Sequence, residues 1–327
     1  MRTCNLLARC LVFAFVSSLA ACGGGGMSAD GGGDDGPPPD AAIQPPARGF
    51  QIVTPDVVIM PGQEITYCYY FRTPNTEPMA IKKWVSEMTP GSHHLIMFTT
   101  GTTDKMPPGT ISAANCGFGA TGNSVPSWTY SAQTASATME LPTDDGTGKP
   151  LGIDIPASSA GFVQMHYFNP SDQPVTAHVT INAEALDAGA AYTKTAAFVT
   201  YNNNINIPAG ATNDVETQTC DGPPAGTKFW LMSTHAHKQA IKTEVLDGTS
   251  MVFSSTDWEH PVAEKWMAAP FKTFASGKVT YRCTYNNPNP YNISSGDSAA
   301  TDEMCMASGY FFPATKPLIC FNNLGPF

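Results

Sequence analysis

Short runs of strand-forming residues, broken by proline and glycine, dominate the body of this 327-residue chain. Val, Thr, Tyr and Phe favour strands, whereas 28 prolines and 29 glycines leave little room for long helices. The chain therefore predicts an all-β protein of two tandem antiparallel β-sandwich domains, jelly-roll-like in kind, because sheets bury their apolar faces in pairs. The clearest expected strands are 57–59, 65–71, 95–98, 162–165, 175–181, 197–201, 229–232 and 278–285.

A faint internal repeat divides the body into two halves. Pro61-Gly62 leads to Cys68 and a His-His pair, and Pro208-Ala209-Gly210 leads to Cys220 and a His-x-His pair. Farther along, 166–170 is echoed by 283–288, both ending in Asn-Pro. Strand character is lost over 184–190, which places the boundary near 184–194. We therefore expect an N-terminal sandwich at 49–188 and a C-terminal sandwich at 189–327.

The first 22 residues are typical of a bacterial lipoprotein signal peptide. A positively charged start precedes an apolar stretch that is too short to span a membrane and ends in Leu19-Ala20-Ala21-Cys22. Cysteine at that place is normally diacylated, and two acyl chains anchor a protein stably. Residues 23–48, rich in Gly, Pro and Asp, predict a flexible linker. Gly23 stands where Asp is usually associated with retention in the inner membrane, so the outer membrane is favoured. We therefore expect an exported, lipid-anchored protein, periplasmic or surface-exposed. An ordinary secreted protein with a chance Cys22 is the alternative.

The nine cysteines divide by position. Two leave with the signal (Cys4 and Cys10) and Cys22 carries lipid, so the body keeps Cys68, Cys116, Cys220, Cys283, Cys305 and Cys320. Six cysteines in an exported body indicate three disulfides, for which fifteen pairings exist. Two lie in the first half and four in the second, so pairing within halves is favoured. Zinc ligation is the weaker alternative, because no Cys-x-x-Cys spacing occurs.

Two histidine pairs are candidate metal ligands. Side chains alternate along a strand, so His235 and His237 project the same way, as a chelate requires. A solvated strand face is the alternative. His93 and His94 point to opposite faces of a regular strand, so they share a metal only across a bulge or turn. The preceding 90–92 segment, Pro-Gly-Ser, could supply it.

Single residues complete the candidate set. His166 lies in an apolar run and Met304 precedes Cys305, although either residue alone is more often part of a core. His178 in an alternating strand and His260 in a loop are left out. If the other six side chains converge, imidazoles with a thioether favour copper, whereas zinc more often recruits carboxylate or thiolate.

The order and spacing of these motifs resemble those of the ascorbate-dependent type II copper monooxygenases, the family of the peptidylglycine α-hydroxylating and dopamine β-monooxygenases. The resemblance spans roughly 50–327. It rests on Cys68, Gly91-Ser92-His93-His94, Gln164-Met165-His166-Tyr167, His235-Ala236-His237, Cys283 and Asp302-Glu303-Met304-Cys305, in that order.

The resemblance implies two copper ions bound by two β-sandwiches that face each other across a solvent-filled cleft. The electron-transfer copper would be held by His93, His94 and His166. The oxygen-binding copper, which hydroxylates substrate, would be held by His235, His237 and Met304. The implied disulfides are Cys68–Cys116, Cys220–Cys320 and Cys283–Cys305. No catalytic side chain beyond the copper ligands is implied.

Two departures from the family concern the substrate. The peptide-amidating branch grips a substrate carboxylate with an Arg two residues before its His-x-His and a Tyr four residues after its Met. Here those places hold Ser233 and Ser308. Ser233 lacks the guanidinium fork, and Ser308 lacks the reach of a phenol. We therefore expect a neutral or cationic, partly apolar substrate. Met306, Tyr310, Phe311 and Phe312 are candidates for an apolar wall, or for core.

These features together predict a copper-dependent monooxygenase that hydroxylates an aliphatic C–H of a small organic substrate with O2 and a reductant such as ascorbate. The alternative is a non-catalytic copper-binding or copper-sensing surface lipoprotein. A formal charge of −10, with only 13% charged residues, argues against nucleic acid as a partner. The expected partners are the substrate, O2, an electron donor, and the membrane through the lipid anchor alone.

Overall fold

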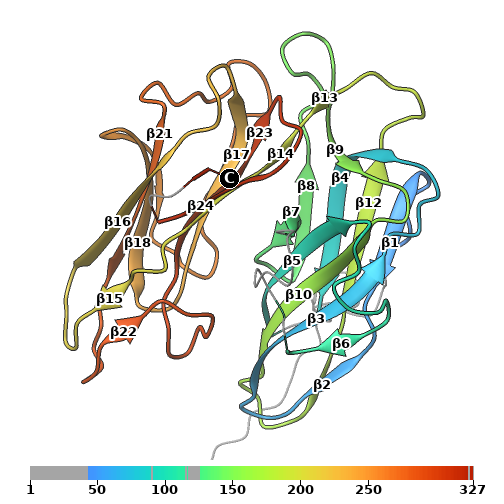
Figure 1. The fold of residues 1–327 in the computed structure, drawn as a ribbon. Helices are drawn as coiled ribbons and strands as arrows, with labels where there is room; N and C mark the ends of the chain where they lie inside the picture. Colours follow the sequence, from blue (N-terminus) through green and yellow to red (C-terminus); the bar gives the residue numbers. More distant parts are fainter. Residues whose placement is uncertain (1–42, 90, 115, 117–125, 323–324, 327) are drawn as a thin grey trace, which may run out of the picture. The chain divides into compact units, whose positions relative to one another are not determined.

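The computed structural model describes residues 43–326, except 90, 115, 117–125 and 323–324. The described residues form 24 strands and no helix, which confirms the all-β prediction (Figure 1). Within this part of the chain, no helix could span a membrane. The predicted signal peptide, most of the linker and Cys4, Cys10 and Cys22 lie outside the described residues.

Two large sheets and one small one make up the first half. One sheet has the order β1 (Gly49–Val53), β12 (Val179–Ala185), β4 (Met79–Met88), β9 (Leu151–Ile155) and β13 (Thr193–Lys194), with β8 (Ser136–Glu140) also beside β4. Strand β13 joins this sheet although it lies past residue 188, the predicted end of the first half. The other has the order β6 (Ile111–Ser112), β3 (Glu64–Arg72), β10 (Ala160–Phe168), β5 (Ser92–Gly101) and β7 (Ser127–Ala132). Strands β2 (Val57–Ile59) and β11 (Val175–Ala177) form a small third sheet.

The second half repeats this plan. A five-stranded sheet has the order β20 (Ala263–Lys265), β17 (Lys228–Ala236), β23 (Cys305–Phe312), β14 (Ala196–Tyr201) and β24 (Leu318–Phe321). A four-stranded sheet has the order β16 (Asp214–Asp221), β21 (Lys278–Tyr285), β18 (Ala240–Asp247) and β19 (Ser250–Ser255). The small pair is β15 (Asn206–Ile207) with β22 (Ile293–Ser294). Except for the β9–β13 and β14–β24 pairs, the strands named here pair antiparallel.

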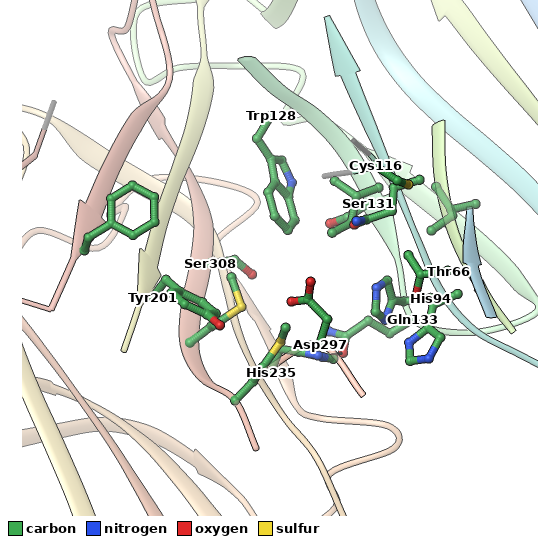
Figure 2. A pocket seen from close by; sticks show the side chains of 17 residues that line it. Thr66, His94, Cys116, Trp128, Ser131, Gln133, Tyr201, His235, Asp297 and Ser308 are labelled. Carbon is green, nitrogen blue, oxygen red and sulfur yellow. Dashed lines mark hydrogen bonds between the residues drawn. The ribbon is translucent and has the colours of Figure 1, made fainter. Parts of the chain in front are cut away.

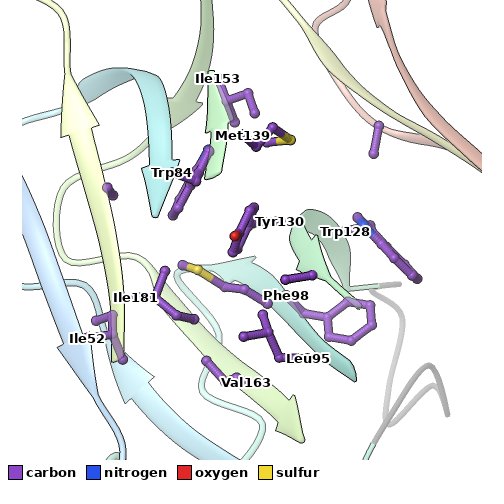
Figure 3. Packing of buried hydrophobic residues seen from close by; sticks show 14 of the residues in the cluster. Ile52, Trp84, Leu95, Phe98, Trp128, Tyr130, Met139, Ile153, Val163 and Ile181 are labelled. Carbon is purple, nitrogen blue, oxygen red and sulfur yellow. The ribbon is translucent and has the colours of Figure 1, made fainter. Parts of the chain in front are cut away.

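Aromatic side chains fill the first core. Trp84 of β4 stacks on Tyr130 of β7 with ring centroids 5.2 Å apart, and both side chains are fully buried (Figure 3). The Tyr130 hydroxyl has a partner in Ser86 at 2.8 Å, which removes the desolvation cost of a buried phenol. This stacking ties β4 to β7, and β7 pairs with β5, which carries two of the candidate ligands.

The five-stranded sheet of the second half is buried on both faces. Phe229 and Phe311 belong to the second core, whereas their neighbours Trp230 and Tyr310 belong to the first core cluster. The alternation follows from the two-residue period of a strand. Tyr310 also donates a hydrogen bond across the halves to the Thr129 carbonyl, at 3.1 Å. Apolar residues on successive positions thus join the two halves.

The internal repeat in the sequence has a structural counterpart. The Asn169 side-chain amide donates to the Ile59 carbonyl at 3.0 Å, and that of Asn287 donates to the Pro208 carbonyl at 2.9 Å. Each amide also reaches a carbonyl four residues downstream, at 2.8 and 2.9 Å. Equivalent asparagines therefore fix the loop that follows β10 in one half and the loop that follows β21 in the other.

The three disulfides have the pairings that the resemblance implied. They are Cys68–Cys116, Cys220–Cys320 and Cys283–Cys305. Disulfides persist in oxidising compartments, so they indicate an exported protein. They also leave none of the six body cysteines as a free thiolate that could bind a metal.

Candidate metal centre

Five of the seven histidines gather into one cluster, which we call the imidazole cluster; four are buried and His93 is half-buried. His93 and His94 lie near the start of β5, His166 lies in β10, and His235 and His237 lie at the end of β17. Their ring centroids are 5.0 Å apart for His93 and His94, 5.3 Å for His94 and His235, and 5.4 Å for His235 and His237. The cluster thus combines candidates from both halves.

A β-bulge turns His93 toward His94. In the ladder between β10 and β5, His166 pairs with His94 but Tyr167 pairs with Ser92, so His93 is an extra residue. The bulge removes the strict alternation that would send neighbours to opposite faces. The sequence-based requirement for an irregularity at this pair is confirmed.

The second pair follows strand periodicity. His235 lies on β17, and His237 follows its last residue, Ala236. Ala236 pairs with Cys305 of β23, and Met304 directly precedes that cysteine. The ladder therefore brings the thioether to the end of the strand that carries the histidine pair.

Three of the imidazoles are held through one nitrogen. His166 Nε2 lies 2.8 Å from Glu64 Oε1, His235 Nδ1 lies 2.7 Å from Gln133 Oε1, and His237 Nδ1 lies 3.0 Å from the Asp302 carbonyl oxygen. An imidazole held in this way has a fixed ring orientation, which is the usual arrangement of metal-binding histidines.

Each imidazole of the cluster has one buried nitrogen without a hydrogen-bond partner among the described residues. These atoms are His93 Nε2, His94 Nδ1, His166 Nδ1, His235 Nε2 and His237 Nε2. A buried polar atom without a partner is costly and needs an explanation. Five such atoms in one cluster are a donor set that could hold a metal.

The potential ligand atoms form two groups. His93, His94 and His166 form one, and His93, His235 and His237 form the other; within each group the ligand atoms lie within 4.8 Å of one another. The buried cluster could therefore hold a metal. His93 belongs to both groups, and the division into two copper sites stays a prediction.

Burial keeps His93, His94, His235 and His237 neutral. Burial, together with the neighbouring imidazoles, lowers the pKa of His93 to about 3 and that of His237 to about 4. The pKa values of His94 and His235 are well below the usual range for the same reasons. Neutral imidazoles can bind a metal at neutral pH without first losing a proton.

A cavity of about 400 Å³ adjoins the cluster (Figure 2). His94, His166, His235 and Met304 line it, so the thioether and three imidazoles face one space. The remaining lining residues are Thr66, Leu95, Ile96, Cys116, Trp128, Ser131, Gln133, Gln164, Tyr201, Asp297, Met306, Ser308 and Phe321.

The residues expected near the substrate fall in different places. Ser308 and Met306 line the cavity, whereas Ser233 is absent from its lining and donates to the Val262 carbonyl at 3.0 Å. Tyr310, Phe311 and Phe312 belong to the buried cores, as the core alternative had it. His178 and His260, left out of the ligand set, have side chains 49% and 63% exposed and lie outside the cluster.

Two carboxylates beside the cluster were missed by sequence reasoning. Burial tends to raise the pKa of Glu64, but hydrogen bonds from His166 and Ser298 outweigh this effect and lower it. Glu303 is fully buried and accepts the backbone N–H groups of His237 and Gln239 at 3.0 and 2.7 Å. Burial raises the pKa of Glu303 to about 7, although these hydrogen bonds lower it. The adjacency of Glu303 to Met304 was the only sequence signal for either residue.

The chain matches no family model and no curated protein.

Proposed function

We propose that the imidazole cluster and Met304 hold two copper ions, and that the protein is a copper-dependent monooxygenase acting on a small organic substrate. The observation that carries the proposal is the set of five buried imidazole nitrogens without partners, beside a cavity that Met304 also lines. The order of motifs, which resembles that of the ascorbate-dependent copper monooxygenases, supports the same conclusion.

The chemistry of the donors favours copper over zinc. Imidazole suits copper in both oxidation states, and a thioether favours Cu(I). The six body cysteines are in disulfides, and the two ligand groups found among the described residues consist of histidines, without thiolate or carboxylate. When bound, copper would supply one-electron redox chemistry and activation of O2, with ascorbate or another small reductant as the electron source.

The chain's own residues would arrange this chemistry. Gln133 and the Asp302 carbonyl fix the rings of His235 and His237, so that Nε2 of each stays directed to a metal. Glu303 holds the backbone of His237 beside Met304. Because His235 and Met304 line the cavity, a substrate in it would lie next to the metal that they hold.

The cavity supports a cationic, partly apolar substrate. Asp297 is the only Asp, Glu, Lys or Arg among the described residues that line it, and Figure 2 shows its carboxylate among Trp128, Tyr201 and Gln133. An exposed carboxylate attracts an ammonium group and repels a carboxylate. Trp128 and Met306 offer apolar surface for the rest of the molecule.

Oxygen consumption with matched substrates tests this function. We expect ascorbate-dependent uptake of O2, with one ¹⁸O atom from ¹⁸O2 in the product, for amines with an apolar body. Their analogues with a carboxylate in place of the amine should not react. Asp297→Asn should raise KM for the amine by about tenfold, a loss of about 1.4 kcal/mol, and should leave KM for a neutral isostere unchanged.

Two outcomes would contradict the assignment in different ways. Copper binding without oxygen uptake for any compound would favour the alternative, a copper-binding or copper-sensing lipoprotein. Efficient turnover of glycine-extended peptides, with loss of rate on amidation of their carboxylate, would show that another basic residue grips a carboxylate.

We also propose that lipid on Cys22 anchors the protein to a membrane, most consistent with the outer membrane. The support is the Leu19-Ala20-Ala21-Cys22 pattern together with the disulfides of an exported body. Cys22→Ser should move the protein from the membrane fraction to the soluble fraction. An unchanged distribution would place the anchor elsewhere.

A further inference from the structure

We propose that Glu64 is a positioning residue that couples metal binding in the first histidine group to the loop carrying Met304. The inference rests on the metal-binding function proposed above. We call residues 295–304 the ligand loop, because Met304 ends it and Asp302 in it holds His237.

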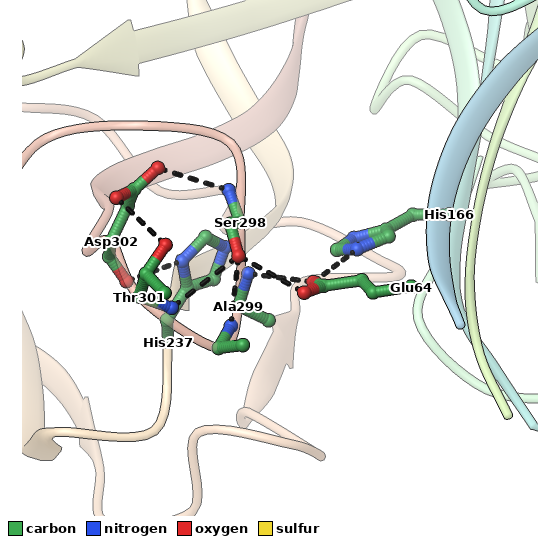
Figure 4. Close-up of polar contacts among 8 residues, drawn as sticks. Glu64, His166, His237, Ser298, Ala299, Thr301 and Asp302 are labelled. Carbon is green, nitrogen blue, oxygen red and sulfur yellow. Dashed lines mark hydrogen bonds and ion pairs between the residues drawn. The ribbon is translucent and has the colours of Figure 1, made fainter. Parts of the chain in front are cut away.

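Glu64 bonds both halves of the molecule at once. Its Oε1 lies 2.8 Å from His166 Nε2 and accepts the Ala299 backbone N–H at 3.0 Å, while Oε2 accepts the Ser298 hydroxyl at 3.0 Å (Figure 4). Ser298 lies 234 positions from Glu64, and the Glu64 side chain is only 21% exposed. Both carboxylate oxygens are thus used, one on a candidate ligand and both on the ligand loop.

The contacts continue from Ser298 to the second histidine group. The Ser298 carbonyl accepts the Asp302 N–H at 2.9 Å, and the Asp302 side chain accepts the Ser298 N–H at 3.3 Å. The Asp302 carbonyl lies 3.0 Å from His237 Nδ1. A continuous path of hydrogen bonds therefore joins His166 of one group to His237 of the other, through Glu64 and the ligand loop (Figure 4).

Metal binding would strengthen this path at its first step. Acceptance by Glu64 fixes the proton of His166 on Nε2 and leaves Nδ1, the atom without a partner, for a metal. A metal on Nδ1 draws electron density from the ring and makes Nε2–H a stronger donor to the carboxylate. The Glu64 carboxylate, held in place by this stronger bond, then holds Ser298 and Ala299 more firmly. By reciprocity, an ordered ligand loop raises metal affinity at His166.

Hydrogen exchange of the ligand loop tests the coupling directly. The background variant is His235→Ala, which leaves the first group complete and the second incomplete. One equivalent of Cu(I), supplied anaerobically, should slow amide exchange over 295–304 by at least about fivefold in this background. Adding Glu64→Gln, which keeps the size of the side chain but removes its charge, should abolish this slowing.

Two further variants separate coupling from simple folding. Glu87→Gln is the matched control, because Glu87 also accepts a serine hydroxyl, from Ser136 at 2.7 Å, but within the first half alone. It should retain the slowing in full. Ser298→Ala removes one of the two bonds from the ligand loop to Glu64 and leaves the Ala299 bond and the bond between Glu64 and His166. It should bind Cu(I) and show less slowing than the background protein, but more than its Glu64→Gln derivative.

Copper analysis of the same samples distinguishes the possible failures. Bound Cu(I) with equal slowing in the background protein and in its Glu64→Gln derivative would overturn the coupling and leave the proposed function standing. Bound Cu(I) without slowing of exchange in the background protein would likewise overturn the coupling and leave the proposed function standing. Absence of copper from the background protein would overturn the coupling together with the metal function on which it rests.

Discussion

Replacing Met304 with isoleucine is expected to lower ascorbate-dependent oxygen consumption by at least about 100-fold while the first histidine group still binds metal. Removing even an outer partner of a metal ligand costs about 10- to 100-fold, so the loss of a direct ligand should cost no less. Isoleucine is apolar and close to methionine in size, so the packing of this partly buried side chain against the first core is largely kept. The measurements are oxygen uptake and copper content of the purified variant.

Met306→Ile is the matched control. Met306 lines the same cavity two residues away, but its side chain is buried in the first core. This variant should keep its copper and its kcat, and any change in its oxygen uptake should come through KM, because Met306 lines the cavity without being a proposed metal ligand. Equal losses in the two variants would assign the effect to packing and remove Met304 from the ligand set. Undiminished oxygen uptake in Met304→Ile would also remove Met304 from the ligand set.

Removing the Cys220–Cys320 disulfide is expected to lower the free energy of unfolding by about 3 to 5 kcal/mol. The bond closes a loop with a sequence separation of 100 residues and ties β16 to β24, in the two sheets of the second half. In the chain-entropy account, a long closed loop restricts the unfolded chain most. The measurement is urea unfolding of a Cys220→Ala/Cys320→Ala variant under non-reducing conditions.

A second disulfide variant isolates the effect of loop length. Cys283 and Cys305 are as deeply buried as the first pair, but their sequence separation is 22. Replacing both with alanine removes similar buried volume, so it should cost about 1 kcal/mol less than the first variant. A loss below about 1 kcal/mol for Cys220→Ala/Cys320→Ala would contradict the loop-closure account.

The sequence predicted those parts of the site that depend on local rules. Strand alternation placed His235 and His237 together, and the same rule required an irregularity at His93 and His94, which the bulge provides. The disulfide pairing came from resemblance alone, because the residues themselves left fifteen pairings open. The all-β class followed from strand-forming runs broken by proline and glycine.

The remaining parts depend on long-range contacts without a local signature. Glu64 is hydrogen-bonded to Ser298, 234 positions away, and Gln133 to His235, 102 positions away. No spacing in the sequence therefore indicates that Glu64 or Gln133 belongs to the site. Asp297 is a candidate substrate-binding residue only because it lines the cavity. The sharing of His93 by two ligand groups depends on how the halves pack, which local patterning leaves open.

Copper stoichiometry tests the central claim most directly. The body of the protein, purified without metal, would be loaded with excess Cu(I) under anaerobic conditions, desalted, and analysed for copper per chain. Two ions per chain are predicted for the wild-type protein, because the proposed function divides the five imidazoles and Met304 into two ligand sets. One ion per chain or fewer in the fully loaded protein would contradict the account.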